Sequence, residues 1–321
     1  MRHLVSVLPS VLLAIGFAAP VAADVITDWT EKALPIVATY SLGAPAYRDM
    51  AMMHVAMFQC VNAIEPLYQP YKGKLEAPPT TSKEAAAAVA AATVLSRLHP
   101  PDAGKIEAMR DRPRAPRRRR RVDDAGQRRR ERSRHLPPPD HARYGKTSTT
   151  RTPQQTETAR LWLYTGPSTF MPIAVQLSKA KPLSVAENAR LFALLSMETH
   201  DAIGAVLEAK YHYEFWRPVT AIRNGDIDGN EKTERDASWE PIGPTPMHPE
   251  YPCAHCIVAH AAGTVMQAFF GTGTVPEFTL TTPTAPGVTH RWTRIADYME
   301  EPSNARVWSG IHYRFSTKVG P

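Results

Sequence analysis

The stretch Ser184–Pro218 reads "SVAENARLFALLSMETHDAIGAVLEAKYHYEFWRP" and decides the fold class. Its apolar residues recur at spacings of three and four, which is typical of an amphipathic α-helix. Ser184 stands where a helix-capping side chain is expected, and Pro218 follows the end of the periodic pattern. The stretch therefore predicts one long helix that ends close to two cationic residues, Lys210 and Arg217.

The same features recur along most of the chain and predict an all-α protein. Further helices are expected over Ala46–Tyr68, from Ser82 to just before Pro100, after Thr152-Pro153, and from the residues after His255 to Gly271. Alternating strand patterns are scarce. The prediction is an all-α helical bundle with long proline-rich loops, the longest between Pro218 and His255.

The N-terminus has the features of an export signal. Arg2 precedes a short apolar run that is interrupted by Pro9 and ends in small residues. This pattern predicts a signal peptide over residues 1–23, with Asp24 as the first mature residue, and a soluble product in the periplasm or outside the cell. A membrane anchor is the alternative reading of the run, but no later segment has the roughly 18 apolar residues that a stable span requires.

A basic tract, residues 111–150, separates two helical parts, 24–110 and 151–321. Arginines between positions 110 and 134 give this region a local charge of +9, so the rest of the chain is nearly neutral although the whole carries +7. Three interpretations remain open: an arm for nucleic acid or anionic membranes, a solvated disordered insertion, or a stretch read out of frame. An exported protein meets little nucleic acid, so no nucleic-acid partner is expected.

Cys253 and Cys256 form a C-x-x-C pair. Ile257 follows the second cysteine where c-type haem attachment requires histidine. A structural zinc site usually has a second ligand pair, which is not evident here. A thiol oxidoreductase centre remains possible, although its fold needs strands around the motif. Cys256 is expected as a small buried residue.

Three cationic motifs carry the functional signal. Lys210 and Arg217 stand seven positions apart, and Arg306 precedes His312 by six. Between them, "PCAHC" (residues 252–256) begins a helix, whose first N–H groups, from Cys253 to His255, are expected to be free to bind an anion. The planar guanidinium group of arginine, with its several N–H donors, and the compact ammonium charge of lysine both suit a tetrahedral oxyanion.

In this order the motifs resemble the signature of the vanadium-dependent haloperoxidase and type-2 phosphatidic acid phosphatase superfamily. Its pattern is K-x6-R-P, P-S-G-H and S-R-x5-H, and here it reads Lys210…Arg217-Pro218, "PCAH" and Ala305-Arg306…His312. "AMMHVAMFQCVNAIEP" and "HYEFWRPVTAIR" are similar to bacterial haloperoxidase-like members. The resemblance skips the basic tract and implies a helical bundle of the haloperoxidase or acid phosphatase type.

The resemblance also implies roles for individual residues. Lys210, Arg217 and Arg306 would neutralise a bound oxyanion, with Cys253 and Ala254 beside it. His312 would be the vanadium ligand of a peroxidase or the nucleophile of a phosphatase, and His255 the general acid–base. The implied activity is vanadate-dependent oxidation of halide by hydrogen peroxide, with small anions as ligands. The alternative is an acid phosphatase that acts through a phosphohistidine and needs no cofactor.

The chain also departs from the family pattern. Cys253 and Ala254 replace serine and glycine, Ala305 replaces serine, and Ser316 stands where an acid often orients the histidine. The helix that normally follows His312 is missing, which suggests a truncated or frame-damaged member. An inactive protein and a non-catalytic basic binding module therefore stay open. His248, seven residues before His255, resembles the histidine of bromide-preferring members and is a candidate for the halide pocket.

Overall fold

A computed structural model describes residues 24–41, 43–110, 145–181 and 183–319. Within these ranges helices predominate, so the predicted all-α fold is confirmed. The α-helices are α1 (Val25–Tyr40), α2 (Ala44–Ile64), α3 (Lys83–Leu98), α4 (Ala103–Arg110), α5 (Pro153–Leu161), α6 (Met171–Ala180), α7 (Val185–Tyr213), α8 (Pro218–Arg223), α9 (Ala254–Phe270) and α10 (Ile295–Trp308). Short 3-10 turns lie at Pro100–Asp102 and Pro167–Thr169, and two strands, β1 (Phe278–Leu280) and β2 (His290–Trp292), form a hairpin.

The helix starts agree with the capping residues of the sequence. The side chain of Ser82 accepts a hydrogen bond from Ala85 N at the start of α3. Thr152 and Ser184 each form a reciprocal capping box, which pairs the free N–H groups at the starts of α5 and α7. Helix α9 ends at Gly271, which adopts a positive φ of 94°.

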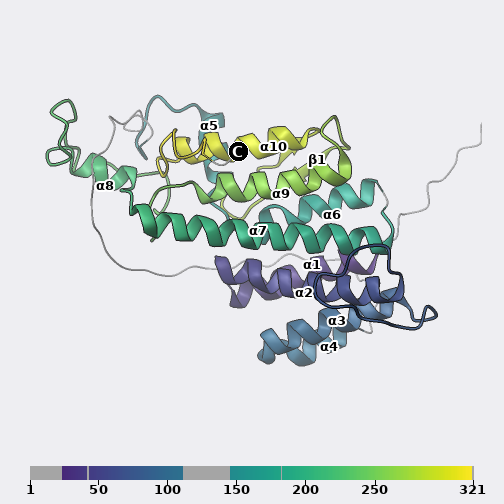
Figure 1. The fold of residues 1–321 in the computed structure, drawn as a ribbon. Helices are drawn as coiled ribbons and strands as arrows, with labels where there is room; N and C mark the ends of the chain where they lie inside the picture. Colours follow the sequence, from purple (N-terminus) through teal and green to yellow (C-terminus); the bar gives the residue numbers. More distant parts are fainter. Residues whose placement is uncertain (1–23, 42, 111–144, 182, 320–321) are drawn as a thin grey trace, which may run out of the picture.

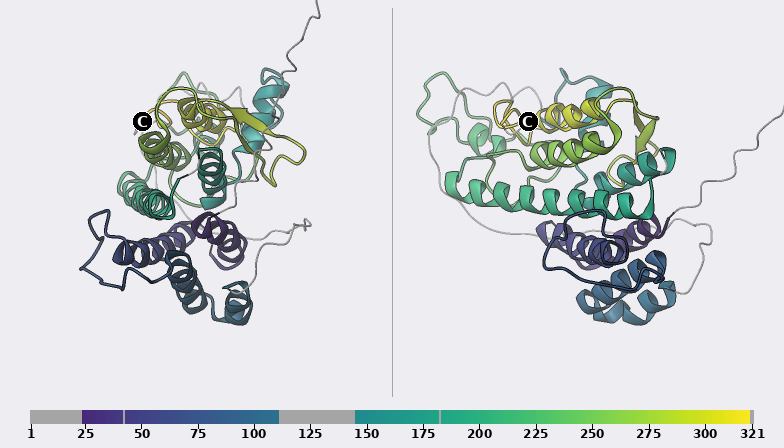
Figure 2. Two further views of the ribbon diagram at one scale, coloured as in Figure 1. Left: turned by 90° about the vertical axis from the view of Figure 1, so that its right-hand side faces the viewer. Right: turned by 45° about the vertical axis from the view of Figure 1, so that its right-hand side comes forward.

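Helix α7 is the central element of the bundle (Figure 1). It packs against α2 on one side and against α9 on the other, and α9 packs in turn on α10. Helices α1–α4 form one layer below α7, and α5, α6, α9 and α10 lie above it (Figures 1 and 2). Because Lys210 lies in the last turn of α7, this packing places it at one end of the bundle.

A buried chain of hydrogen bonds joins the lower layer to α7. His54 of α2 is fully buried, and its Nε2 lies 2.9 Å from Thr30 Oγ1 while its Nδ1 lies 2.7 Å from Ser196 Oγ. Thr30 Oγ1 donates to Ile26 O, so it accepts from His54 Nε2–H, and His54 Nδ1 accepts from the serine hydroxyl. Burial lowers the pKa of His54 to about 3, so the ring is neutral.

The sequence analysis did not predict helices α1, α4, α6, α8 and α10 or the β1–β2 hairpin. The expected loop from Pro218 to His255 begins with helix α8, in which Pro218 occupies the first helical position, where its missing N–H costs nothing. The hairpin pairs Phe278 with Trp292, whose rings stack, and three residues per strand are too few for a clear alternation. The helix predicted to reach Tyr68 ends at Ile64, just before Pro66.

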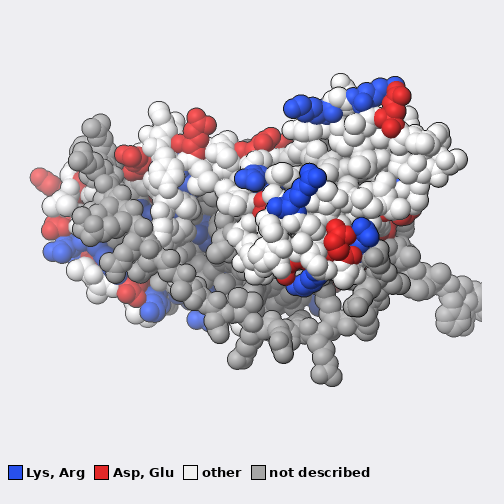
Figure 3. Space-filling model, turned by 90° about the horizontal axis from the view of Figure 1, so that it is seen from below, with Lys and Arg blue, Asp and Glu red and all other residues white. Residues whose placement is uncertain are grey.

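The signal-peptide prediction falls on residues 1–23 and most of the basic tract on residues 111–144, which lie outside the described ranges. On the face seen in Figure 3, acidic and basic side chains of the described residues are interspersed. Among the helices that the structure describes, none has the length and apolar character of a membrane span.

Candidate active site

The three cationic motifs converge at one end of the bundle. Lys210 lies in the last turn of α7, and Arg217 directly precedes α8. Arg306 lies in the last turn of α10, and His312 follows in the loop after it. All four side chains are buried. The loop 248–253, which leads into α9, runs between them and supplies most of their hydrogen-bond partners.

Lys210 is held by backbone oxygens of this loop. Its Nζ donates to the carbonyl oxygens of Pro249 (3.1 Å), Glu250 (2.7 Å) and Pro252 (2.5 Å). Burial lowers the pKa of Lys210 to about 6, and the positive charges of two neighbouring arginines add to the decrease. A bound anion would oppose both effects by favouring the charged ammonium group.

Arg217 joins the loop to the histidine motif. Its Nε donates to His248 O (3.1 Å), and one terminal nitrogen donates to Pro249 O (3.2 Å). The other terminal nitrogen donates to Ile311 O (3.0 Å) and lies 3.1 Å from His312 Nε2. Burial lowers the pKa of Arg217 to about 10, so the guanidinium stays charged at neutral pH.

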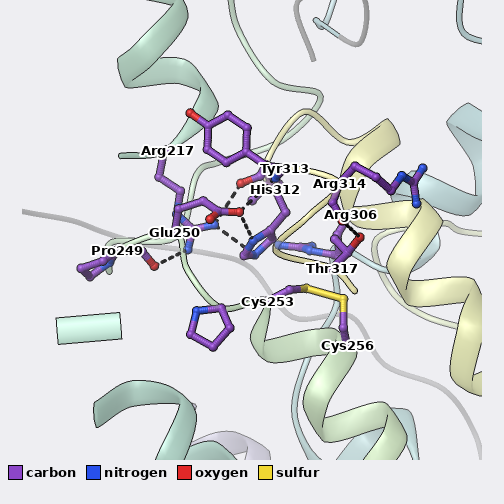
Figure 4. A network of polar contacts seen from close by, with 12 residues as sticks. Arg217, Pro249, Glu250, Cys253, Cys256, Arg306, His312, Tyr313, Arg314 and Thr317 are labelled. Carbon is purple, nitrogen blue, oxygen red and sulfur yellow. Dashed lines mark hydrogen bonds and ion pairs between the residues drawn. A yellow bond between two sulfur atoms is a disulfide. The ribbon is translucent and has the colours of Figure 1, made fainter. Parts of the chain in front are cut away.

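The contacts of His312 define its tautomer. Figure 4 shows its ring between the guanidinium of Arg217 and the carboxylate of Glu250. The guanidinium can only donate, so Nε2 is the acceptor and the ring proton is on Nδ1, which donates to Glu250 Oε1 at 2.7 Å. The same oxygen accepts from Tyr313 N at 3.0 Å. Burial and the nearby Arg217 charge keep the pKa of His312 well below its usual value, so the imidazole is neutral.

Arg306 is the least satisfied cation of the group. One terminal nitrogen donates to Trp162 O at 2.9 Å, while its buried Nε has no hydrogen-bond acceptor among the described residues. Burial, followed by the charge of Arg217, lowers the pKa of Arg306 to about 9. A buried guanidinium group without a carboxylate partner strongly attracts an anion.

His255 occupies the second position of α9 and is half-buried. Its Nε2 donates to Tyr164 O (3.3 Å), which leaves Nδ1 as the basic nitrogen. Burial, and then the charge of Arg306, hold the pKa of His255 well below its usual value. The backbone N–H groups of Ala254 and His255 have no acceptor in the part of the chain that the structure describes, as expected at a helix start.

His255 also borders a small hollow with room for about one water molecule. The hollow lies between α2, the 3-10 turn at Pro167–Thr169, α9 and α10. Its walls are mostly aromatic and apolar, and its lining residues are Tyr47, Trp162, Thr165, Thr169, Phe170, His255, Val258, Ala259 and Tyr298.

Comparisons with known proteins agree with this arrangement. The family model described as VCPO second helical-bundle domain matches residues 190–321, which include all three motifs. The part of the chain that carries the motifs is therefore similar to this haloperoxidase domain. No curated protein matches the sequence.

Solved structures of vanadium-dependent haloperoxidases share the fold of this chain. A structure titled as the first bacterial vanadium-dependent iodoperoxidase matches with a TM-score of 0.64 and 19% identity, over 92% of this chain and 91% of that one. The apo form of a bacterial vanadium-dependent chloroperoxidase matches with a TM-score of 0.55 and 13% identity, over 86% and 90%. The holo form of a bacterial vanadium-dependent chloroperoxidase gives 0.54 and 13%, over 86% and 89%.

The structure differs from the sequence-based expectation at Cys253. Its sulfur forms a disulfide with Cys256, and its backbone N–H donates to Ser316 O at 3.3 Å. Cys253 therefore offers neither the free thiol nor the free N–H that we expected from the family motif. Cys256 is buried, as expected, but as a disulfide partner rather than as a free apolar side chain. Three backbone N–H groups at the start of α9 were predicted to bind an anion, and those of Ala254 and His255 remain available.

The structure places His248 beside the site, half-buried. Its Nδ1 lies 3.1 Å from a terminal nitrogen of Arg217 and accepts from it. Burial, followed by the charges of Arg217 and Lys210, lowers the pKa of His248 to about 4. The imidazole is thus neutral and polar, next to the cationic group.

Glu250 is the residue of the site that the sequence analysis missed. It is fully buried, and burial raises the pKa of its carboxyl to about 7 against the opposing effects of its hydrogen bond from Tyr313 N and the charge of Arg217. The family pattern places an acid that orients the histidine four positions after it, where Ser316 stands in this chain. The acid comes instead from the loop, 62 positions before His312. The acidic residue in "HPEYP" was the only available signal.

Proposed function

We propose that this protein is a vanadate-dependent haloperoxidase, which oxidises halide ions with hydrogen peroxide. The observation that carries the proposal is the meeting of three buried basic side chains, Lys210, Arg217 and Arg306, with a neutral histidine whose Nε2 is an acceptor. The likeness to bacterial haloperoxidase structures favours a peroxidase over the phosphatase alternative.

The donor set fits a tetrahedral oxyanion such as vanadate. The unpaired Nε of Arg306 and the N–H groups of Ala254 and His255 are available donors in the described part of the site. Lys210 and Arg217 supply charge, but their N–H groups are engaged by carbonyl oxygens of the loop and of Ile311. Anion binding therefore requires these two side chains to exchange some carbonyl contacts for anion oxygens.

Each histidine has a distinct role in the proposal. His312 Nε2 would hold the vanadium, since a neutral imidazole with its other nitrogen on a carboxylate is the usual form of a metal-bound histidine. Bound vanadate would supply Lewis-acid activation of peroxide. His255 would take up the peroxide proton on Nδ1, because its lowered pKa leaves the ring neutral, with a free lone pair, at neutral pH. His248 would border the halide.

Two features support export of the enzyme. The sequence begins with the pattern of a cleaved signal peptide, and the Cys253–Cys256 disulfide suits an oxidising compartment. We therefore place the protein in the periplasm or outside the cell, acting on small anions and peroxide rather than on nucleic acid.

The decisive experiment combines binding with activity. Calorimetry should show orthovanadate binding, with phosphate as a competitor, and Arg217→Ala should weaken it at least tenfold because a buried guanidinium donor is removed. Arg223→Ala, at the other end of α8 and partly exposed, is the matched control. With vanadate and peroxide the wild type should brominate a phenol-red reporter. Hydrolysis of p-nitrophenyl phosphate without bromination would assign the site to a phosphatase instead, and a folded protein with neither activity would refute both.

A further inference from the structure

Glu250 contacts two of the three motifs at once. Its backbone carbonyl accepts from Lys210 Nζ at 2.7 Å, and its backbone N–H donates to Phe215 O at 2.9 Å, close to Arg217. Its carboxylate accepts from His312 Nδ1 at 2.7 Å and from Tyr313 N at 3.0 Å. One residue of the loop therefore links the end of α7 to the histidine segment after α10.

The direction of these hydrogen bonds has a chemical result. An imidazole has one proton to place on two nitrogens when it is neutral. A carboxylate oxygen beside Nδ1 holds the proton there, and Nε2 then keeps its lone pair for a ligand or an electrophile. Arg217 also favours this tautomer by donating to Nε2. Without the carboxylate, the Nδ1 proton would be buried without its acceptor, so the tautomer with the proton on Nε2, which is not nucleophilic, would become more populated.

We propose that Glu250 is the positioning residue of this site: its carboxylate fixes His312 in the tautomer with a free Nε2, in place of the acid that this chain lacks at position 316. The predicted effect of Glu250 on anion binding rests on the proposed function. The tautomer itself is a property of the anion-free protein.

Two substitutions separate positioning from simple electrostatics. Both Glu250→Gln and Glu250→Leu remove a negative charge from a cationic pocket, so electrostatics alone would tighten anion binding in both. The glutamine oxygen still accepts from His312 Nδ1, whereas leucine, of similar size, cannot. If Glu250 positions His312, the two variants should therefore differ. Glu250→Gln should keep or improve the affinity for orthovanadate. Glu250→Leu should weaken the affinity by about 10- to 100-fold, as is typical when the partner of a ligating histidine is lost.

A rescue experiment uses the place where the acid is missing. Ser316 is buried, and its hydroxyl is among the groups that favour ionisation of Glu250, so position 316 lies beside the same carboxylate. Adding Ser316→Asp to Glu250→Leu should restore a carboxylate near His312 and recover most of the lost affinity. Glu240→Ala, which changes an exposed glutamate of the same long connection, is the control and should bind as the wild type does.

The readouts are calorimetry with orthovanadate and with phosphate, and nitrogen-15 NMR of the histidine rings without anion. In the wild type and in Glu250→Gln, His312 should carry its proton on Nδ1. In Glu250→Leu only the contact with Arg217 still favours this tautomer, so the fraction with the proton on Nε2 should increase. A wild type with the proton on Nε2 overturns the proposal even if the leucine variant fails to fold. Unchanged or tighter anion binding in folded Glu250→Leu also overturns it. A wild type that binds neither anion would refute the proposed function alone, because the NMR result still decides the role of Glu250.

Discussion

Replacing Arg306 by methionine should make the anion-free protein more stable while it removes anion binding. Arg306 is 2% exposed, and its pKa falls from 12.5 to about 9, which corresponds to roughly 5 kcal/mol of cost for burying its charge. The variant loses the hydrogen bond to Trp162 O, and an unsatisfied buried carbonyl costs about 1–3 kcal/mol. The difference leaves a gain of about 2–4 kcal/mol in the free energy of unfolding, within the range seen when buried charges are replaced by apolar groups.

This gain has a defined pH dependence. At pH 7 Arg306 is charged in both the folded and the unfolded state, so the wild type carries the full cost. As the pH rises through about 9, the folded state releases the proton while the unfolded state retains it, and the cost falls. The stability difference between Arg306→Met and the wild type should therefore shrink above pH 9.

The assay is urea denaturation of both proteins with and without phosphate or orthovanadate. At one hundred times its Kd, the anion should stabilise the wild type by about 2.7 kcal/mol and leave Arg306→Met unchanged. Arg48→Met, an exposed substitution on α2, controls for the general effect of losing a positive charge. A variant that is less stable than the anion-free wild type, or that still gains stability from the anion, would refute the reasoning.

Three further predictions address other features. When the protein is alkylated without a reductant, mass spectrometry should find modification at Cys60 alone, and after reduction it should find all three cysteines modified. Three alkylated cysteines in the unreduced protein would contradict the disulfide. His54→Leu should lower stability by about 1–3 kcal/mol at pH 7 in thermal or urea unfolding. Because the pKa of His54 is lowered from 6.5 to about 3, the wild type should lose roughly 2 kcal/mol between pH 7 and pH 5 through this group, and the variant should lack that slope. His248→Phe should raise the ratio of chloride to bromide turnover in halide-dependent kinetics, and an unmoved ratio would remove His248 from the halide pocket.

Local signals predicted α2, α3, α5, α7 and α9, because the causes of these helices are local. Ser82, Thr152 and Ser184 cap helices through contacts with residues only three positions away. Helices α4, α6 and α8 and the β1–β2 hairpin were missed because they are short and depend on their packing. Helices α1 and α10 were missed although they are longer, and each contains an internal proline, Pro35 or Pro302, which usually indicates a break.

The candidate site was predictable only in part. The order of the motifs led to Lys210, Arg217, Arg306 and His312, which the structure brings together. The partnership of Glu250 with His312 could not be read from spacing, since 62 positions separate the two residues and only the fold brings them within 2.7 Å. The disulfide was likewise open in the sequence, where a C-x-x-C pair fits several chemistries.

The loop before α9 holds the cations through its main chain rather than its side chains. Lys210 and Arg217 contact carbonyl oxygens at positions 248, 249, 250 and 252, and such oxygens are present whatever residue stands there. Substitutions at His248 or Tyr251 thus change what faces the pocket or the surface without removing those contacts. Under the proposed function, the loop is for that reason a natural place for evolution to vary halide preference, and for a protein engineer to build a library, with Glu250 kept constant.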